Sequence, residues 1–330
     1  MVIARTPMRI SFLGGGTDYP DYYRRNGGMT LATGIDKYTF ITVKKLPWYF
    51  DHKIKVHYST MERCDTIDEL KHTSVRECLR HMNVTKEIEI HYAGDLPART
   101  GMGSSSSFTV CLLHALHALQ GKFVSNVELA KLAVHLEQNV MHERVGSQDQ
   151  YSAALGGLRL LKFNQDDSIE HHPIVMTPGR LDLLQGQLML FYTGLTRTAH
   201  EVLDEQIQKT KAGTLDSDLQ KLGDLVPKAV QILCSDQSLE GFGELLHEGW
   251  VLKRGLSSQI ASDQIGTWYE TARKAGAIGG KLLGAGGGGC LLFFVPTEKQ
   301  DAVRKALPDL CEIPFRFDQV GSTIVYADQN

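Results

Sequence analysis

The stretch from Pro97 to Ser107 is the feature that most constrains the fold of this chain. Its residues, Pro-Ala-Arg-Thr-Gly-Met-Gly-Ser-Ser-Ser-Ser, join a glycine-rich turn to a serine cluster. Apolar residues then recur at helical spacing up to Leu119, so the serines are predicted to open a helix. Gly101 and Gly103 allow backbone conformations that other residues avoid. The free amide groups and the dipole of such a helix start favour a bound phosphate.

This segment differs from the better known phosphate loops. No lysine follows its last glycine, and the GxxxxGK[ST] pattern of a Walker A loop occurs nowhere in the chain. A serine that merely caps a helix is the alternative, but a cap needs one serine and this segment has four. We therefore predict a nucleotide-phosphate site. Its candidate residues are Pro97, Gly101, Met102, Gly103, Ser104, Ser105, Ser106 and Ser107.

Composition excludes several classes of function. A chain of 330 residues has room for two domains of about 150 residues each. Its net charge of −3 gives no electrostatic argument for nucleic acid or an anionic membrane as partner. The six cysteines are scattered without a CxxC pair, which is typical of a reducing compartment. With no signal sequence and no apolar run near ~18 residues, we expect a cytoplasmic protein without a membrane span.

Strand and helix patterns alternate in mixed order along the chain. Strands are predicted at 9–13, 40–43, 88–92, 158–163, 188–192, 290–295 and 313–317, and helices near 104–120, 126–143, 198–211, 217–234, 240–257 and 263–275. This order predicts an α+β fold with two lobes rather than a regular alternation around one parallel sheet. The division is expected near residues 180–187, which gives lobes of 1–183 and 184–330.

A second glycine cluster, Gly284-Ala-Gly-Gly-Gly-Gly289, contains the GxGxxG spacing of dinucleotide-binding folds. That fingerprint must follow a strand and open a helix, whereas here a helical segment is expected before it and a strand, 290–295, after it. A glycine run before a buried strand is better explained by close approach to the phosphate loop or to a substrate, a glycine-rich hairpin being the alternative. Gly286 and Gly287 are the candidate ligand contacts.

A third segment, from Pro7 to Tyr19, ends in three glycines, a threonine and an aspartate directly after a predicted strand. The turn would place the carboxylate of Asp18 where it can accept hydrogen bonds from sugar hydroxyl groups. Ordinary turn chemistry is the alternative for an aspartate at such a position. The candidate substrate-binding residues are Gly15, Gly16, Thr17 and Asp18.

Together the three segments resemble the GHMP kinases, the superfamily named for galactokinase, homoserine kinase, mevalonate kinase and phosphomevalonate kinase. Its signatures P-x-R-[IV]-x-x-x-G, P-x-x-x-G-[LM]-G-S-S-S and G-A-G-G-G-G occur here in that order and span nearly the whole chain. The resemblance implies a two-lobed α+β fold. The N-terminal lobe would be like domain 2 of ribosomal protein S5, the C-terminal lobe ferredoxin-like, and the active site would lie between them.

Within the superfamily the chain is most similar to the D-glycero-D-manno-heptose 7-phosphate kinases, through Gly-Gly-Gly-Thr-Asp, Gly146-Ser-Gln-Asp149, Tyr192-Thr-Gly-Leu-Thr-Arg197 and the residues from His247 to Lys253. This likeness implies phosphorylation of the anomeric C1 hydroxyl to give the 1,7-bisphosphate, on the route to GDP-heptose and surface glycans. Fucose kinases share two of these patterns, so an L-fucose or other sugar 1-kinase is the alternative. A homologue that binds ligand without catalysis is a weaker one.

The resemblance also implies the cofactors, ATP and Mg²⁺, and the roles of four residues. Ser105 and Glu137 would hold Mg²⁺ through oxygen ligands. Asp149 would take up or orient the proton of the anomeric hydroxyl, and Arg9 would stabilise the developing negative charge. The spacing between Glu137 and Asp149 is one residue longer than in the mevalonate kinases.

A sugar phosphate needs room and positive charge. Galactokinase-like enzymes have Glu-His where this chain has Gly15 and Gly16, so the smaller residues leave space for a seventh carbon and its phosphate. A phosphate in a partly desolvated cleft requires cations, and Arg197 and Lys281 are the candidates. A small sugar phosphate is thus the expected partner. The sequence leaves the oligomeric state open, a homodimer included.

Overall fold

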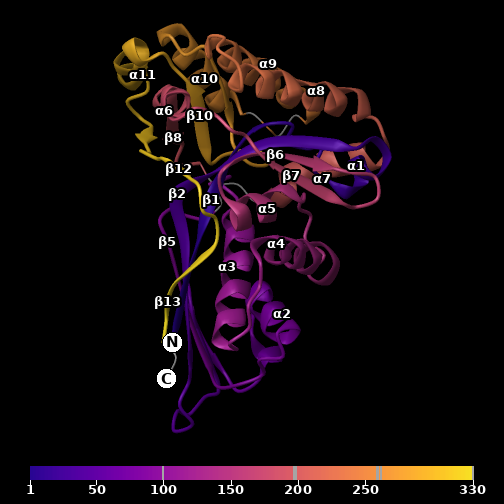
Figure 1. Cartoon of the computed structure of the whole chain (residues 1–330), viewed down its shortest axis with the longest axis vertical. Helices are drawn as coiled ribbons and strands as arrows, with labels where there is room; N and C mark the ends of the chain where they lie inside the picture. The colour runs from indigo at the N-terminus through magenta and orange to yellow at the C-terminus, as the bar shows by residue number, and fades with distance from the viewer. Residues whose placement is uncertain (99, 196–198, 258–259, 261, 329–330) are drawn as a thin grey trace.

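The computed structural model describes residues 1–98, 100–195, 199–257, 260 and 262–328, without the side chains of 199–204. Figure 1 shows two lobes, a lower one built on long strands and an upper one covered by helices. The N-terminus and residues 323–327 lie side by side at the long strands of the lower lobe (Figure 1). The mixed α+β architecture predicted from the sequence is confirmed. No helix in the described ranges is long and apolar enough to cross a membrane.

The larger sheet has nine strands among the described residues. They are β1 Val2–Leu13, β2 Gly28–Lys45, β3 Ile54–His57, β4 Met61–Cys64, β5 Ile88–Gly94, β6 Leu158–Phe163, β7 Ile169–Pro173, β12 Phe317–Asp318 and β13 Thr323–Ala327. The order is β13-β1-β2-β5-β3-β4, with β6 and β12 also pairing with β2, and β7 with β6. All pairs are antiparallel except β3 with β5.

Five helices belong to the lower lobe. They are α1 Pro20–Asn26, α2 Thr73–His81, α3 Ser104–Leu119, α4 Asn126–His135 and α5 Gln148–Leu155, with a 3-10 turn at Ile67–Glu69 and a π-helical turn at Leu136–Val140. Helices α2 to α5 gather on the same side of the long strands (Figure 1). The apolar residues of α3 from Phe108 to Leu116 are buried, because this helix lies between the sheet and the other helices.

The upper lobe contains a four-stranded sheet and its helices. The strands are β8 Leu188–Tyr192, β9 Gly279–Leu282, β10 Cys290–Phe294 and β11 Cys311–Glu312, in the order β11-β8-β10-β9. The helices are α6 Pro178–Gly186, α7 Ala199–Lys211, α8 Asp216–Leu233, α9 Glu240–Leu256, α10 Asp263–Ala275 and α11 Gln300–Ala306, with a 3-10 turn at Thr297–Lys299. Helices α8 and α9 run along the top of the molecule (Figure 1).

The buried hydrophobic residues that the structure describes form two clusters, and the second half of β1 belongs to the one that fills the upper lobe. Met8, Ile10 and Phe12 of β1 belong to the same buried cluster as the residues of α8, α9 and the small sheet. The ring of Phe12 meets that of Phe242 on α9 edge to face, with ring centroids 5.4 Å apart. The end of β1, where the glycine-rich turn begins, is therefore held against the upper lobe.

Three local predictions were wrong. No strand was expected directly before the glycine cluster, but residues 279–282 form β9, so the cluster lies in a hairpin between β9 and β10. The strand expected at 313–317 is divided into β11 and β12, which pair with different sheets; Pro314, which has no N–H group, lies between them. The helix expected at 126–143 ends in the π-helical turn at Val140.

The division of the chain into 1–183 and 184–330 stays a prediction. After the small sheet is complete, the chain returns to the larger sheet and adds β12 beside β2 and β13 beside β1. These C-terminal strands therefore pair with the sheet of the N-terminal part.

Candidate active site

A pocket of about 270 Å³ lies where the two lobes meet. Its wall is formed by the end of β1, the turn after it, the starts of α3 and α5, helices α7 and α9, and the β9–β10 hairpin. The structure brings most of the residues predicted from the sequence to this one place. Those that line the pocket are Arg9, Gly15, Gly16, Asp18, Gly101, Gly103, Ser104, Ser105, Ser106, Asp149, Lys281 and Gly286.

The start of α3 faces the pocket. Gly103 precedes the helix in the left-handed conformation, with φ 71°, and no side chain caps the helix start. Ser104, Ser105 and Ser106 follow it and line the pocket. Because the first amide groups of a helix have no partner within the helix, this uncapped end can bind an anion. The geometry is that expected of a phosphate loop.

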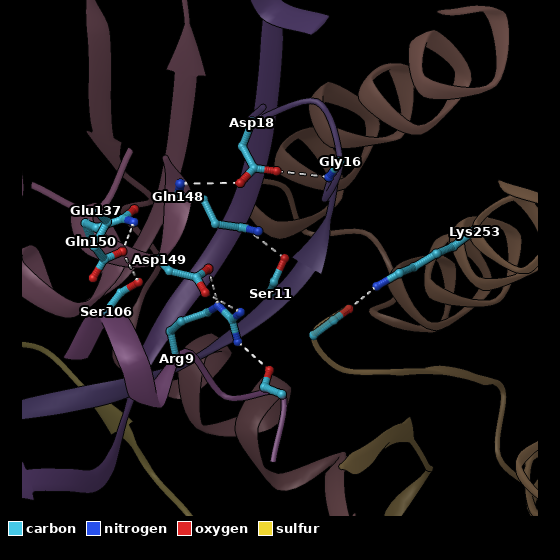
Figure 2. Close-up of polar contacts among 12 residues, drawn as sticks. Arg9, Ser11, Gly16, Asp18, Ser106, Glu137, Gln148, Asp149, Gln150 and Lys253 are labelled. Atoms are coloured by element: carbon cyan, nitrogen blue, oxygen red, sulfur yellow. Dashed lines mark hydrogen bonds and ion pairs between the residues drawn. The ribbon is translucent and has the colours of Figure 1, made fainter. Parts of the chain in front are cut away.

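Arg9 and Asp149 form a bidentate ion pair beside this loop (Figure 2). The Nε and Nη2 atoms of Arg9 each donate to a different carboxylate oxygen of Asp149, both at 2.8 Å. Nη1 donates to the carbonyl oxygen of Gly101 at 2.6 Å. A Cβ on Gly103 would lie 3.3 Å from Asp149 Oδ2, so the loop packs directly on the pair. The carboxylate of Asp149 is thus fixed in orientation next to the uncapped helix.

Asp18 joins the glycine-rich turn to the start of α5. Its carboxylate accepts hydrogen bonds from the amide groups of Gly16, at 2.9 Å, and Gln148, at 3.4 Å (Figure 2). Burial, together with the nearby charge of Asp149, raises the pKa of Asp18 to about 6. Asp18 therefore stabilises the turn, as the alternative interpretation of the sequence had it. It also lines the pocket, where a ligand could reach it.

Glu137 lies behind the pocket wall. Its Oε2 atom accepts hydrogen bonds from the hydroxyl group of Ser106, at 2.8 Å, and from the amide group of Gln150 (Figure 2). Burial raises the pKa of Glu137 to about 7. The π-helical turn that carries Glu137 closes with the amide of Met141 bound to the carbonyl of Leu136. Such a turn takes up one residue more than an α-helical turn.

The cluster around Glu137 has the chemistry of a magnesium site. Two buried oxygen atoms, Oε1 of Glu137 and Oε1 of Gln150, have no hydrogen-bond partner among the described residues. Carboxylate, amide and hydroxyl oxygens suit Mg²⁺, which takes few protein ligands and completes its shell with water and substrate phosphates. In the part of the chain that the structure describes, no group of three or more His, Cys, Asp or Glu side chains could hold a metal. The hydroxyl group bonded to Glu137 is that of Ser106, while Ser105 is exposed to the pocket.

The two glycine-rich segments touch each other. A Cβ on Gly284 would lie 2.5 Å from Cα of Gly101, and one on Gly289 would lie 2.4 Å from the carbonyl oxygen of Thr100. Only glycine allows this approach. The sequence offered two explanations for the glycine cluster, a hairpin and a close approach to the phosphate loop. The structure contains both.

Several predicted residues do not line the pocket. Pro97 is exposed away from it, Met102 is fully buried in the core, and Gly287 donates its amide to the carbonyl of Ile260. Two hydroxyl groups bond to backbone carbonyls instead: that of Ser107 to Thr6 and that of Thr17 to Gly14 and Met29. Their proposed contacts with ligand, like that of Glu137, stay predictions. Arg197 lies outside the described residues.

The structure adds pocket residues that sequence reasoning did not single out. These are Ser11, Tyr19, Arg144, Gln148, Gln206 and Lys253. One signal pointed to Lys253: it follows Leu246, Gly249 and Trp250 at helical spacing, so a charged residue occupies a position on the buried side of α9. The hydroxyl group of Ser11 and the amide of Gln148, 2.9 Å apart, carried no such signal, because they come together only through the pairing of distant segments.

Comparison with known proteins agrees with this geometry. Residues 70–157 match the GHMP kinases N terminal domain, and residues 228–313 match the GHMP kinases C terminal domain. The chain is 25% identical over 315 residues to a D-glycero-alpha-D-manno-heptose 7-phosphate kinase of Campylobacter jejuni, covering 91% of both chains. It is 27% identical to an L-fucokinase/L-fucose-1-P guanylyltransferase of Bacteroides fragilis, covering 92% of this chain and 35% of that protein.

A solved structure shares the whole fold. It is that of a D-glycero-D-manno-heptose 1-phosphate kinase from Bacteroides thetaiotaomicron, which superimposes with a TM-score of 0.82 at 23% identity and covers 100% of both chains. The two matching domains together span more than half of this chain and include the serine-rich start of α3 and Asp149. On these grounds the chain belongs to the GHMP kinase family.

Proposed function

We propose that this protein is an ATP-dependent sugar kinase that phosphorylates the anomeric C1 hydroxyl of D-glycero-D-manno-heptose 7-phosphate and releases the 1,7-bisphosphate. The observation that carries the proposal is the Arg9–Asp149 pair, which fixes a carboxylate beside an uncapped helix start in a pocket between the lobes. Phosphoryl transfer depends mainly on positioning and on neutralising charge, and this arrangement supplies both. The similarity to the Campylobacter jejuni enzyme supports the choice of sugar.

Each part of the pocket has a role in this reaction. The amide groups at the start of α3 bind the nucleotide phosphates. Asp149 accepts a hydrogen bond from the C1 hydroxyl and orients it or takes its proton. Arg9 uses three N–H groups in the contacts with Asp149 and Gly101, and its two remaining N–H groups can bind the transferring phosphoryl group. The turn at Gly15 and Gly16 leaves room for the sugar.

Magnesium is part of the proposal. Glu137 and Ser106 would hold the ion, and Ser105 remains the ligand proposed on the pocket side. When bound, Mg²⁺ would offset the charge of the β- and γ-phosphates.

A sugar 1-kinase that acts on L-fucose is the second candidate, favoured by the 27% identity to the Bacteroides fragilis protein. The decisive experiment incubates the protein with ATP, Mg²⁺ and, in separate reactions, D-glycero-D-manno-heptose 7-phosphate, L-fucose and D-mannose, and follows the products by ³¹P NMR. We expect a new anomeric phosphate signal with the heptose phosphate. Turnover of fucose in preference to the heptose phosphate would establish the second candidate instead.

A further inference from the structure

Two lysine side chains enter the pocket from the upper lobe, Lys253 from α9 and Lys281 from β9. The ammonium group of Lys281 donates to the carbonyl oxygen of Phe12 at 2.8 Å. That of Lys253, drawn in Figure 2, donates to the carbonyl oxygen of Gly284. Within the described ranges, neither lysine forms an ion pair with a carboxylate. Each ammonium group has three N–H groups, so two on each lysine are not used by these carbonyl groups.

Such an arrangement is unfavourable for the empty protein. Lys281 is only 6% exposed, and burial lowers the pKa of both lysines, that of Lys253 to about 8. The charge of Arg9 adds to this lowering for both lysines, and the charge of Lys253 adds to it for Lys281. Buried cations are normally paired with an anion of the protein or of a ligand. The carboxylates of Asp18 and Asp149 partly offset the repulsion between these cations, but they are hydrogen-bonded by backbone amides and by Arg9 rather than by the lysines.

The charges that line the pocket also favour an anionic ligand. Among the residues that the structure describes, they comprise the cationic side chains Arg9, Lys253 and Lys281, together with Arg144, which has other contacts, and the carboxyl groups Asp18 and Asp149. Asp149 is bound by Arg9, and Asp18 is bound by backbone amides. The pocket is therefore positive, although the chain as a whole has a net charge of −3. A ligand with two negative charges complements it.

The position of Lys281 indicates which part of the ligand it meets. Phe12 lies at an irregularity in the pairing of β1 with β2, between Ser11 and Leu13, so its carbonyl is available to the lysine. The glycine-rich turn begins two residues after Phe12, at Gly14. Lys281 thus stands at the turn assigned to the sugar rather than at the start of α3, which is assigned to the nucleotide.

We propose that Lys253 and Lys281 together form a phosphate subsite that holds the phosphate already present on the sugar. The inference rests on the proposed function only for the identity of that sugar. The γ-phosphate of ATP has the same chemistry and is the other source of such a dianion. The lysines could instead serve only to connect β9 and α9 to neighbouring carbonyl groups by hydrogen bonds. In that case a neutral hydrogen-bond donor in their place would not weaken phosphate binding.

The test uses the whole protein, saturated with the non-hydrolysable nucleotide AMP-PNP and Mg²⁺, and measures binding by calorimetry. Lys253→Gln and Lys281→Gln keep a donor group but remove the charge, and Lys228→Gln on an exposed position of α8 is the control. We expect each pocket variant to weaken D-glycero-D-manno-heptose 7-phosphate by about 10-fold or more and the unphosphorylated heptose by less than about 2-fold. Melting temperatures close to that of the wild type would show that the variants fold.

Three outcomes overturn the proposal. Equal losses for the two sugars would show that the lysines do not recognise phosphate. Weaker AMP-PNP binding with unchanged ADP binding would assign the lysines to the γ-phosphate instead. Inorganic phosphate tests the subsite without any sugar. If the wild type and both variants bound inorganic phosphate with the same affinity, the subsite would also be excluded. A wild type that binds the heptose phosphate through the lysines without phosphorylating it would refute the proposed function alone.

Discussion

At the scale of single residues, Asp149 and Arg9 work as one unit. The fork of the guanidinium group matches both carboxylate oxygens at 2.8 Å, and the side chain of Arg9 is only 5% exposed. An ion pair with this geometry holds the carboxylate in one orientation. We infer that orientation of the sugar hydroxyl is the main contribution of Asp149, and proton transfer the second.

Replacing Asp149 by Asn tests this role. The amide keeps the shape of the side chain but loses its charge and one acceptor, so we expect kcat to fall about 10²-fold or more. The affinity for AMP-PNP should change less than about 2-fold, since the start of α3 is the proposed nucleotide site. Steady-state kinetics and calorimetry measure the two quantities, with the exposed Asp182→Asn as control. A variant that turns over at the rate of the wild type would remove Asp149 from the reaction.

At the scale of elements, the phosphate loop and the β9–β10 hairpin support each other. Gly101 has a φ of +76°, and a Cβ there would lie 2.4 Å from the carbonyl oxygen of Leu283. The loop before α3 thus keeps its path only while the hairpin packs against it. This contact links the nucleotide site to the strand that carries Lys281.

The chain offers a matched pair of glycines to measure this contact. Gly121 has a similar φ of +66° but no atom within 4 Å of the position of a Cβ. Gly121→Ala should therefore cost only the backbone strain, about 1–2 kcal/mol. We expect Gly101→Ala to lower the melting temperature further and to weaken AMP-PNP binding, which Gly121→Ala should leave intact. Equal effects of the two substitutions on stability and binding would mean that the contact with the hairpin contributes nothing.

At the scale of the whole molecule, the last part of the chain joins the two lobes. After the small sheet it returns to the larger one, and Asp318 marks the point of return. Its carboxylate accepts hydrogen bonds from the amide groups of Val320 and Gly321, at 3.0 and 2.7 Å, and from the hydroxyl group of Tyr38 at 3.0 Å. Asp318 is 5% exposed, so water does not replace these bonds when the carboxylate is removed.

Asp318→Ala should therefore lower the free energy of unfolding by about 1.5–3 kcal/mol, the range for a buried charged group that loses its hydrogen bonds. Asp309→Ala, at an exposed position shortly before it, should stay within about 0.5 kcal/mol of the wild type. Urea unfolding followed by circular dichroism measures both. If the two variants are equally stable, the turn at Asp318 does not hold the C-terminal strands in place.

The sequence by itself determined what depends on neighbours along the chain. Gly101, Gly103 and the serines after them predicted an uncapped helix start for phosphate, and the structure places them at the pocket. Left-handed glycines and helix starts are local properties, so a short segment is enough to specify them. The order of three such segments also predicted the two-lobed α+β fold, which the structure confirms.

Only the tertiary structure decided which distant residues meet. It placed Glu137 beside Ser106, turned Lys253 into the pocket, and made residues 279–282 a strand where none was expected. These outcomes depend on contacts between segments that are far apart in the sequence. A local sequence pattern does not reveal how favourable such contacts are. The segment 279–282, Gly-Gly-Lys-Leu, has no local pattern that specifies a strand, and pairing with β10 selects the strand.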